Sequence, residues 1–399
     1  MEASPTRRRP RSQSPDAEAA HGALDYLYPE LLNEILSRLP LRDAVRTSAL
    51  ARAWRHRWES VPSLRFIWTG RADPGAISDV LRRYSCPVRE FRHYYVTEAS
   101  FGHSDRWLRL LALRVVQSLF LDFKRSDDDE LLHTLHPSIF SCRGLTTLYL
   151  GGCYIPAPPP GFTGLPNLTE LRLRKVGFTE GARVLELLIA TSPLLESLRL
   201  EYLSLPLSNG VYNQWIIRAP KLQSLTIDAI FDDEWQINDL PSLEEADIDC
   251  VGYSPDRDIV KLMTELAHAT KLKLSMPVKV ADPCAFNYYL HTPALEVLDF
   301  ELDENYSEDD EVDCDFLNAL WTDDDDLFSN LIRVGVTYTT CKLSEMLFIE
   351  FLLSEARRLQ ELHVCLDSFC AKSNEAAATE LAKYRRASPR AKVFFSRND

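Results

Sequence analysis

Residues 165–173 read LPNLTELRL, residues 192–200 read SPLLESLRL and residues 219–227 read APKLQSLTI. In each stretch a proline precedes a strand-like pattern of leucine, two residues, leucine, one residue and a last apolar residue. The middle leucines of the three stretches are 27 residues apart. Side chains on alternate positions of a strand point to the same face, and one short strand cannot bury that face alone. The stretches therefore predict stacked repeats, each strand packing against its neighbours.

Weaker copies of the pattern occur on both sides of these three stretches. They are centred on Leu119, Leu148, Ala246, Leu272, Leu298, Val334 and Leu362. Residues 182–190 and 344–356 are predicted as helices on the convex side. Over residues 114–367 the pattern resembles the leucine-rich repeats of plant F-box proteins, whose period it approaches. The resemblance implies an α/β solenoid, with a curved, mostly parallel β-sheet inside and helices and loops outside.

The block before the repeats is predicted to be helical. Pro29 suits the first turn of a helix, and the leucines and isoleucine between residues 31 and 39 recur at helical spacing until Pro40. Two further short helices are expected, over 42–50 and 51–60. Trp54 and Trp58 are four residues apart and share a face of the second of these. Three short helices are too small to bury two tryptophans alone, so the block is expected to pack on a partner or on the next domain.

Residues 27–40, LYPELLNEILSRLP, and residues 42–55, RDAVRTSALARAWR, resemble the two halves of the F-box motif in its plant form. The match spans residues 24–66. It implies a non-catalytic, substrate-recognition subunit of a Skp-cullin-F-box type E3 ubiquitin ligase, which binds a Skp-type adaptor and, through it, a cullin. The adaptor-binding positions implied by the resemblance are Leu27, Pro29, Leu32, Ile35, Leu36, Leu39, Pro40 and Val45, with Trp54 supporting the packing.

One departure from the family pattern keeps other hypotheses open. The family usually has Leu-Pro-Asp-Glu where this chain has Leu27-Tyr28-Pro29-Glu30. If that change abolishes adaptor binding, the chain would be a leucine-rich-repeat interaction scaffold. A third hypothesis, a hormone co-receptor with a small molecule in the concave face, finds no pocket signal in the sequence.

The predicted organisation has five parts. They are a disordered tail over 1–23, the F-box over 24–66, a linking or capping segment over 67–113, leucine-rich repeats over 114–367 with an acidic insertion over 301–326, and a C-terminal cap over 368–399 that resembles that of FBD-type plant F-box proteins. The tail carries four arginines between residues 7 and 11, either a nuclear-localisation signal or a solvated segment. We expect the protein in the nucleus, the cytoplasm or both.

The residues between the strand leucines are predicted to face the concave surface. Those singled out for binding a protein substrate, whose identity the sequence does not give, are Tyr149, Arg172, Arg174, Arg199, Asp228, Asp247 and Asp249. The earlier strands carry basic residues and the later ones mostly acidic residues. We hypothesise a bipolar concave face that selects a partner of complementary charge; the alternative is that these are solvated strand residues.

Composition argues against several other classes of protein. The net charge is −14, and the segment 301–326 holds 13 acidic residues without lysine or arginine, so no general nucleic-acid binding is expected. The N-terminus lacks the apolar core of a signal peptide, and no apolar run is long enough to span a membrane. The nine cysteines lack zinc-ligand spacing and predict free thiols in a reducing compartment. Without P-loop, dinucleotide, hydrolase or zinc-protease motifs, we expect no catalytic residues, metal or cofactor.

Overall fold

The computed structural model describes residues 28–50, 54–61, 65–69, 72–124, 133–205, 214–231, 234–252, 261–262, 265–266, 269–278, 296–302 and 328–397. The tail predicted over 1–23 and most of the acidic insertion predicted over 301–326 lie outside these residues.

The N-terminal block is helical, as predicted. It consists of α2 (Pro29–Arg38), α3 (Leu41–Arg46) and the 3-10 helices η1 (Thr47–Ala49) and η3 (Arg57–Ser60). Pro29 occupies the first turn of α2, where its missing N–H costs no hydrogen bond. The predicted second helix is divided between α3 and η1. The third, expected over 51–60, contains only η3 in its described part.

Thirteen strands form one sheet in which each strand pairs in parallel with the next. Its strands are β1 (Arg65–Thr69), β2 (Glu90–Val96), β3 (Ser118–Phe123), β4 (Thr147–Gly151), β6 (Glu170–Arg174), β8 (Ser197–Glu201), β10 (Ser224–Phe231), β12 (Glu245–Gly252), β13 (Lys271–Val278), β14 (Val297–Leu302), β15 (Arg333–Thr339), β16 (Glu361–Leu366) and β17 (Lys392–Arg397).

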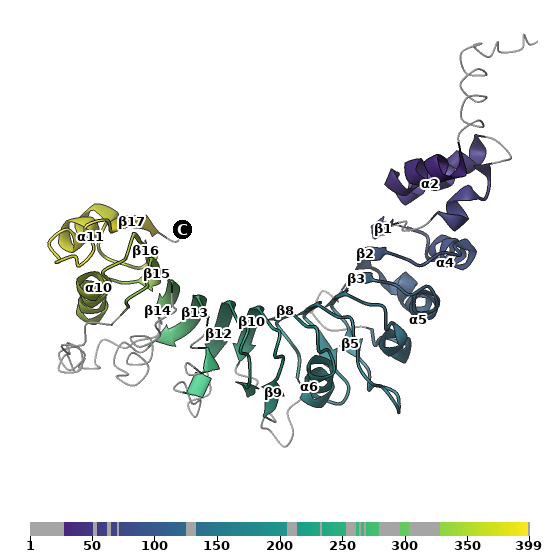
Figure 1. Cartoon of the computed structure of the whole chain (residues 1–399). Coiled ribbons are helices and arrows are strands. Elements are labelled where there is room, and N and C mark those ends of the chain that lie inside the picture. The colour runs from purple at the N-terminus through teal and green to yellow at the C-terminus, as the bar shows by residue number, and fades with distance from the viewer. Residues whose placement is uncertain are drawn as a thin grey trace, which may run out of the picture.

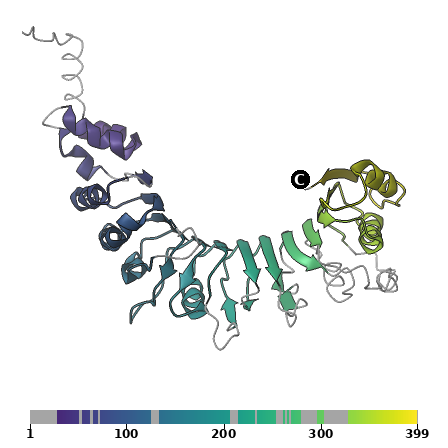
Figure 2. The same ribbon diagram turned by 180° about the vertical axis from the view of Figure 1, so that it is seen from behind.

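The sheet lines the inner side of an arc, and the helices lie on its outer side (Figures 1 and 2). The outer elements are α4 (Pro74–Arg83), α5 (Glu98–Leu113), η4 (Pro137–Ser141), α6 (Ala182–Ala190), α10 (Leu343–Glu355) and α11 (Asn374–Leu381), together with two small sheets formed by β5 (Tyr154–Ile155) with β7 (Gly177–Phe178) and by β9 (Trp215–Ile217) with β11 (Trp235–Ile237). Helices pack about 8–10 Å apart and strands about 4.8 Å apart, so the strand side must be the concave one. The predicted fold class is confirmed.

The core is a ladder of apolar side chains, one from each strand at the same register. From β1 to β17 it runs through Phe66, Phe91, Leu119, Leu148, Leu171, Leu198, Leu225, Ala246, Leu272, Leu298, Val334, Leu362 and Val393. All but the last are buried. Burying one leucine side chain contributes about 1.5–3 kcal/mol, so the ladder stabilises the stack along its whole length.

The solenoid begins earlier than predicted. The segment 67–113, expected to be a linking or capping segment, contributes β2, α4 and α5, and its first residues complete β1. Phe66 and Phe91 occupy the ladder positions of these two strands, so the leucine pattern that marks the later repeats is missing there. At the other end, the predicted cap adds α11 and β17 to the same sheet.

Candidate functional site

Helix α2 has a buried side and an adjoining exposed side. Leu32 and Leu36 are fully buried in the core. Beside them, Tyr28, Leu31 and Ile35 form an outer stripe, with 75%, 52% and 43% of their surface exposed. Residues three or four apart lie on the same side of a helix, so the stripe is continuous over two turns. An exposed row of large apolar side chains in a small helical block is typical of a protein-binding face.

The adaptor-binding residues predicted from the sequence fall into separate places. Leu32, Leu36 and Trp54 are buried and hold the helices together. Pro29, Ile35 and Pro40 are exposed, Leu39 and Val45 are half-buried, and Leu27 lies outside the described residues. The structure therefore differs from the prediction at Leu32 and Leu36, because the apolar residues of α2 divide between an inner and an outer face. Sequence reasoning did not include Tyr28 and Leu31 among the contact residues.

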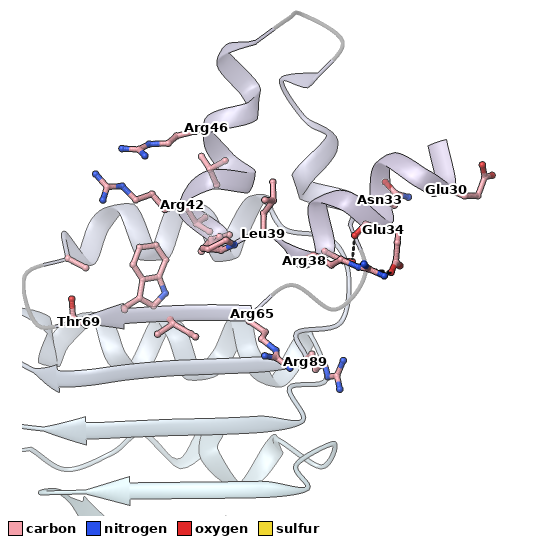
Figure 3. A pocket seen from close by; sticks show the side chains of 18 residues that line it. Glu30, Asn33, Glu34, Arg38, Leu39, Arg42, Arg46, Arg65, Thr69 and Arg89 are labelled. Carbon is pink, nitrogen blue, oxygen red and sulfur yellow. Dashed lines mark hydrogen bonds and ion pairs between the residues drawn. The ribbon is translucent and has the colours of Figure 1, made fainter. Parts of the chain in front are cut away.

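A groove of about 1400 Å³ separates α2 and α3 from β1, the edge strand of the sheet (Figure 3). Leu39, Pro40 and Val45, three of the predicted adaptor-binding residues, line it together with Ile67 and Trp68 of β1. The groove was not predicted, since it arises only when the helical block docks on the first strand.

Five arginines line this groove. Arg38, Arg46 and Arg65 form ion pairs with acidic neighbours at 2.7, 3.3 and 3.4 Å. Arg42 and Arg89 form none among the residues that the structure describes. The groove therefore combines an apolar floor with positive charge at its rim.

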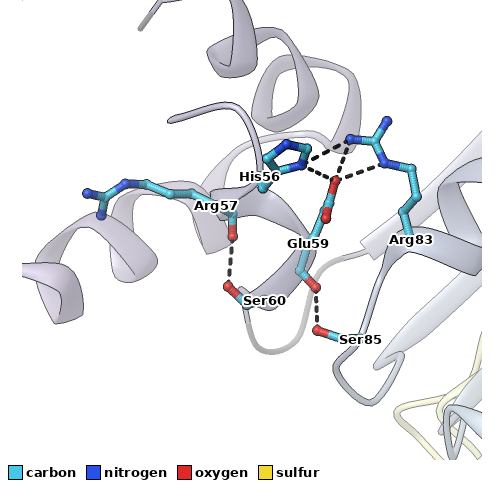
Figure 4. A network of polar contacts seen from close by, with 6 residues as sticks. All are labelled: His56, Arg57, Glu59, Ser60, Arg83 and Ser85. Carbon is cyan, nitrogen blue, oxygen red and sulfur yellow. Dashed lines mark hydrogen bonds and ion pairs between the residues drawn. The ribbon is translucent and has the colours of Figure 1, made fainter. Parts of the chain in front are cut away.

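The helical block is fixed to the solenoid by a polar network (Figure 4). Glu59 of η3 accepts hydrogen bonds from Nε of Arg83, at the end of α4, at 2.8 Å and contacts Nδ1 of His56 at 2.9 Å. The carbonyl oxygen of Glu59 also accepts from the backbone N–H and the hydroxyl of Ser85, both at 2.9 Å. Partial burial would raise the pKa of Glu59, but the bonds to His56 and Arg83 outweigh it and lower that pKa.

Aromatic packing reinforces this junction. The guanidinium of Arg83 lies 5.3 Å from the ring centre of the buried Trp58. Tyr84, which is fully buried, donates its hydroxyl proton to the carbonyl oxygen of Val61 at 2.8 Å, and its ring meets that of Phe66 edge-on at 5.0 Å. The helical block and the solenoid thus share one continuous core, which sets the orientation of one relative to the other.

The predicted substrate-binding residues lie in two rows on the concave face. In the first row, Tyr149 pairs in register with Arg172, and Arg172 with Arg199; the row continues through Thr226 to Asp247. In the second row, Arg174, Glu201, Asp228 and Asp249 follow one another on β6, β8, β10 and β12. The leucines beside them point into the buried core, so these residues point to the opposite, concave face of the sheet.

Glu201 brings the basic residues of β6 and β8 together. Its carboxylate lies 3.0 Å from Arg172, 3.5 Å from Arg174 and 3.6 Å from Arg199. Glu201 is buried beneath the three guanidiniums, whose own side chains stay 40–49% exposed. One carboxylate therefore organises three positive charges, and Asp122, near Arg174, is a second carboxylate beside them.

An acidic cluster follows on β10 and β12. Burial raises the pKa of Asp228, a hydrogen bond from Tyr202 opposes that rise, and the nearby carboxylates of Asp249, Glu201 and Asp247 raise it further. Asp247 has a partial counterion in Lys273, 3.5 Å away. The bipolar charge pattern expected from the sequence is present on the concave face, although its role in binding stays a prediction.

An aromatic shelf lies next to the basic residues, on the side nearer the helical block. Tyr94 of β2 lies 4.5 Å from Phe120 of β3, and Phe120 stacks on Tyr149 of β4 at 3.9 Å with the rings nearly parallel. Arg172 caps the series, 5.4 Å from the ring centre of Tyr149. The sequence prediction included Tyr149 but missed Tyr94 and Phe120; the position of Phe120 before Leu121 in a degraded repeat was the available signal.

No group of three or more histidine, cysteine, aspartate or glutamate side chains in the described ranges is arranged to hold a metal ion. Within the same ranges, no helix combines the length and the apolar character that a membrane crossing requires.

Comparison with known proteins gives two family matches. Residues 24–66 match the F-box domain, and residues 104–276 match the LRR repeats of FBD-associated F-box protein At5g56370.

Curated relatives agree with these matches. An FBD-associated F-box protein, At5g38590 of Arabidopsis thaliana, is 25% identical over 60% of this chain and 64% of its own length. The putative F-box/FBD/LRR-repeat protein At1g16940 is 27% identical over 60% and 58%, and the F-box/FBD/LRR-repeat protein At1g13570 is 30% identical over 51% and 48%, both from the same plant. The chain thus spans about half to two thirds of the length of the relatives it matches. It joins an F-box domain to leucine-rich repeats of the kind found in plant F-box/FBD/LRR-repeat proteins.

Proposed function

We propose that this chain is the substrate-recognition subunit of a Skp-cullin-F-box type ubiquitin ligase. It binds a Skp-type adaptor through the F-box, and through it a cullin, and it holds a target protein on the concave face of the repeats. The observation that carries the proposal is the outer stripe of α2, which exposes Tyr28, Leu31 and Ile35 within the segment that matches the F-box.

The adaptor would cover the outer stripe and extend toward Pro40. Leu31 and Ile35 are 52% and 43% exposed, so covering them removes about half of each side chain from water, which contributes about 1.5–3 kcal/mol in total. Tyr28 brings an aromatic ring with a polar end, a residue type enriched at interfaces. Its presence in place of the usual proline is therefore compatible with adaptor binding.

The subunit is proposed to act by proximity and without catalysis of its own. Ubiquitin transfer by other subunits requires that the bound target stay at a fixed place relative to the adaptor. The junction formed by Glu59, Arg83, Tyr84 and Trp58 supports this, because it ties the F-box to the first solenoid strands. We place this activity in the nucleus, the cytoplasm or both, and imaging of a tagged chain with and without residues 7–11 tests that.

The test is binding of the purified chain to a purified Skp-type adaptor. A chain with both Leu31→Glu and Ile35→Glu is expected to lose at least tenfold in affinity, given the apolar contribution above. Leu343→Glu is the matched control, because Leu343 is 69% exposed in α10, at the other end of the arc from α2 (Figure 1). Leu36→Glu is unsuitable, since Leu36 is fully buried and the change would unfold the block itself.

Full binding by the chain with both substitutions would contradict the assignment of the outer stripe. No binding by the folded wild-type chain would favour the second candidate, an interaction scaffold without adaptor.

A further inference from the structure

The concave face carries three chemically different zones in strand order. Tyr94, Phe120 and Tyr149 form the aromatic shelf on β2, β3 and β4. The arginines around Glu201 form a basic zone on β6 and β8. The acidic zone, on β10 and β12, holds Asp228, Asp247 and Asp249. These seven strands are consecutive in the sheet (Figure 1).

We propose that this face binds an extended target segment that carries an aromatic or large apolar residue, then an acidic residue, then a basic residue, with the aromatic end nearest the F-box. The proposal rests on the proposed function, because it names the class of target segment that the repeats would deliver.

The spacing of the strands fixes the spacing of the ligand residues. Neighbouring strands are about 4.8 Å apart and an extended chain advances about 3.3 Å per residue. The centre of the aromatic shelf is about two and a half strand steps from the centre of the basic zone, or about 12 Å. The basic and acidic zones are about two steps apart, or about 10 Å. The acidic residue therefore follows the aromatic one by about four positions, and the basic residue follows about three positions later.

The basic zone is suited to a carboxylate. Glu201 neutralises one of the three guanidinium charges and remains buried beneath them. Asp122 lies near Arg174 and offsets a second positive charge. A carboxylate arriving from the concave side meets the remaining positive charge and exposed N–H donors that can bind it in pairs.

The acidic zone completes the complementarity. The zone holds three carboxylates, and among the described residues Lys273, 3.5 Å from Asp247, is the cation that pairs with them. Burial and the neighbouring carboxylates raise the pKa of Asp228. A lysine or arginine placed over β10 and β12 relieves that repulsion. Reversing the peptide charges would instead place like charges together at both zones. The charges of the face therefore determine which way round the peptide binds.

The aromatic shelf supplies the apolar contact. Phe120 and Tyr94 are half-buried on the concave side of the sheet. An aromatic or large apolar side chain on the shelf buries its own surface and excludes water from the neighbouring charge pairs.

The experiment is selection from a displayed library of random twelve-residue peptides on the immobilised full-length chain. Enriched peptides are expected to share an aromatic or large apolar residue, an acidic residue about four positions on and a basic residue about three positions later, in either chain direction. No enrichment, or enrichment without this acid-to-base spacing, overturns the proposal.

A charge exchange then tests the assignment with a gain of binding. The chain with both Arg199→Glu and Asp249→Lys is expected to bind the enriched peptide at least tenfold more weakly, and the same peptide with its acidic and basic residues exchanged at least tenfold more tightly, by fluorescence anisotropy. Arg172 and Arg174 still hold Glu201 in this variant. Loss without the gain, or binding that requires a phosphorylated peptide, overturns the proposal.

Adaptor binding is measured on the same preparations. If the peptide binds and the charge-exchanged chain prefers the exchanged peptide, but the chain does not bind the adaptor, only the ligase function is refuted. Adaptor binding without peptide enrichment would refute this inference alone.

Discussion

Removing one oxygen atom at the junction should loosen the F-box from the solenoid. The Tyr84 hydroxyl is fully buried and donates to the carbonyl oxygen of Val61 at 2.8 Å. In Tyr84→Phe the ring keeps its edge-on contact with Phe66, but the carbonyl of Val61 loses this buried partner. Losing the bond and leaving the carbonyl unsatisfied costs about 1–2 kcal/mol.

That cost should appear locally. Repeat proteins respond to a change mainly in the affected unit and its neighbours, so the opening free energy of residues 28–61 falls by the same amount. Their amide hydrogens should then exchange about 5–30-fold faster. Strands β6, β8 and β10, at the middle of the sheet, should keep their rates.

The assay is hydrogen exchange followed by mass spectrometry on the wild-type chain, Tyr84→Phe and the control Tyr95→Phe. Tyr95 is 65% exposed, so its hydroxyl is replaced by water contacts at little cost. Unchanged exchange over 28–61 in Tyr84→Phe, or an equal rise in β6 to β10, would refute the idea that this bond couples the F-box to the first repeats.

Three further predictions follow from the core, the junction and the thiols. Leu198→Ala leaves a cavity in the fully packed ladder and should lower the free energy of unfolding by about 2–5 kcal/mol, measured with urea. The pKa of Glu59 is lowered in the folded chain, so its carboxylate should stabilise the junction above its usual pKa near 4.5 and lose that effect as the pH falls through the lowered value. The urea midpoints of the wild-type chain and of Glu59→Gln should therefore differ at pH 7 and converge in acid. Burial raises the pKa of Cys142 to about 12, so an alkylating reagent should label the partly exposed Cys86 in the native chain and Cys142 only after unfolding.

Much of the fold could be predicted because the spacing of the leucines along the sequence determines which residues align when the strands pair. The copies centred on Leu171, Leu198 and Leu225 align at one level of the sheet, as the 27-residue intervals predicted. The helix predicted over 182–190 appears as α6 with the same bounds. Here local pattern and tertiary packing agree, which is where sequence reasoning is most reliable.

The earlier strands could not be recognised in this way. In β1 and β2 the ladder residues are Phe66 and Phe91, and aromatic and charged neighbours hide the alternation. The outer elements β9 and β11 were likewise not predicted, because three-residue strands carry too little periodicity to be detected.

Many residues of the candidate site could be identified from the sequence, but their arrangement in space only in part. Helical spacing grouped Leu31, Leu32, Ile35 and Leu36 on one apolar face, but two of them turn inward and two outward. Which side becomes the core depends on where the solenoid docks, and a single sequence does not specify that. The convergence of Arg172 and Arg174 on Glu201 depends likewise on strand register, which brings residues 29 and 27 positions apart into contact, whereas Arg199 lies two residues before Glu201 on the same strand.

We propose that the F-box block receives an adaptor while the concave face stays free for a target. The most direct measurement is hydrogen exchange of the full chain with and without a saturating Skp-type adaptor. We expect slower exchange over residues 28–50, where α2, α3 and η1 lie, and unchanged exchange in β6, β8, β10 and β12. Protection of the concave strands in place of 28–50, or no protection at all with a folded chain, would contradict it.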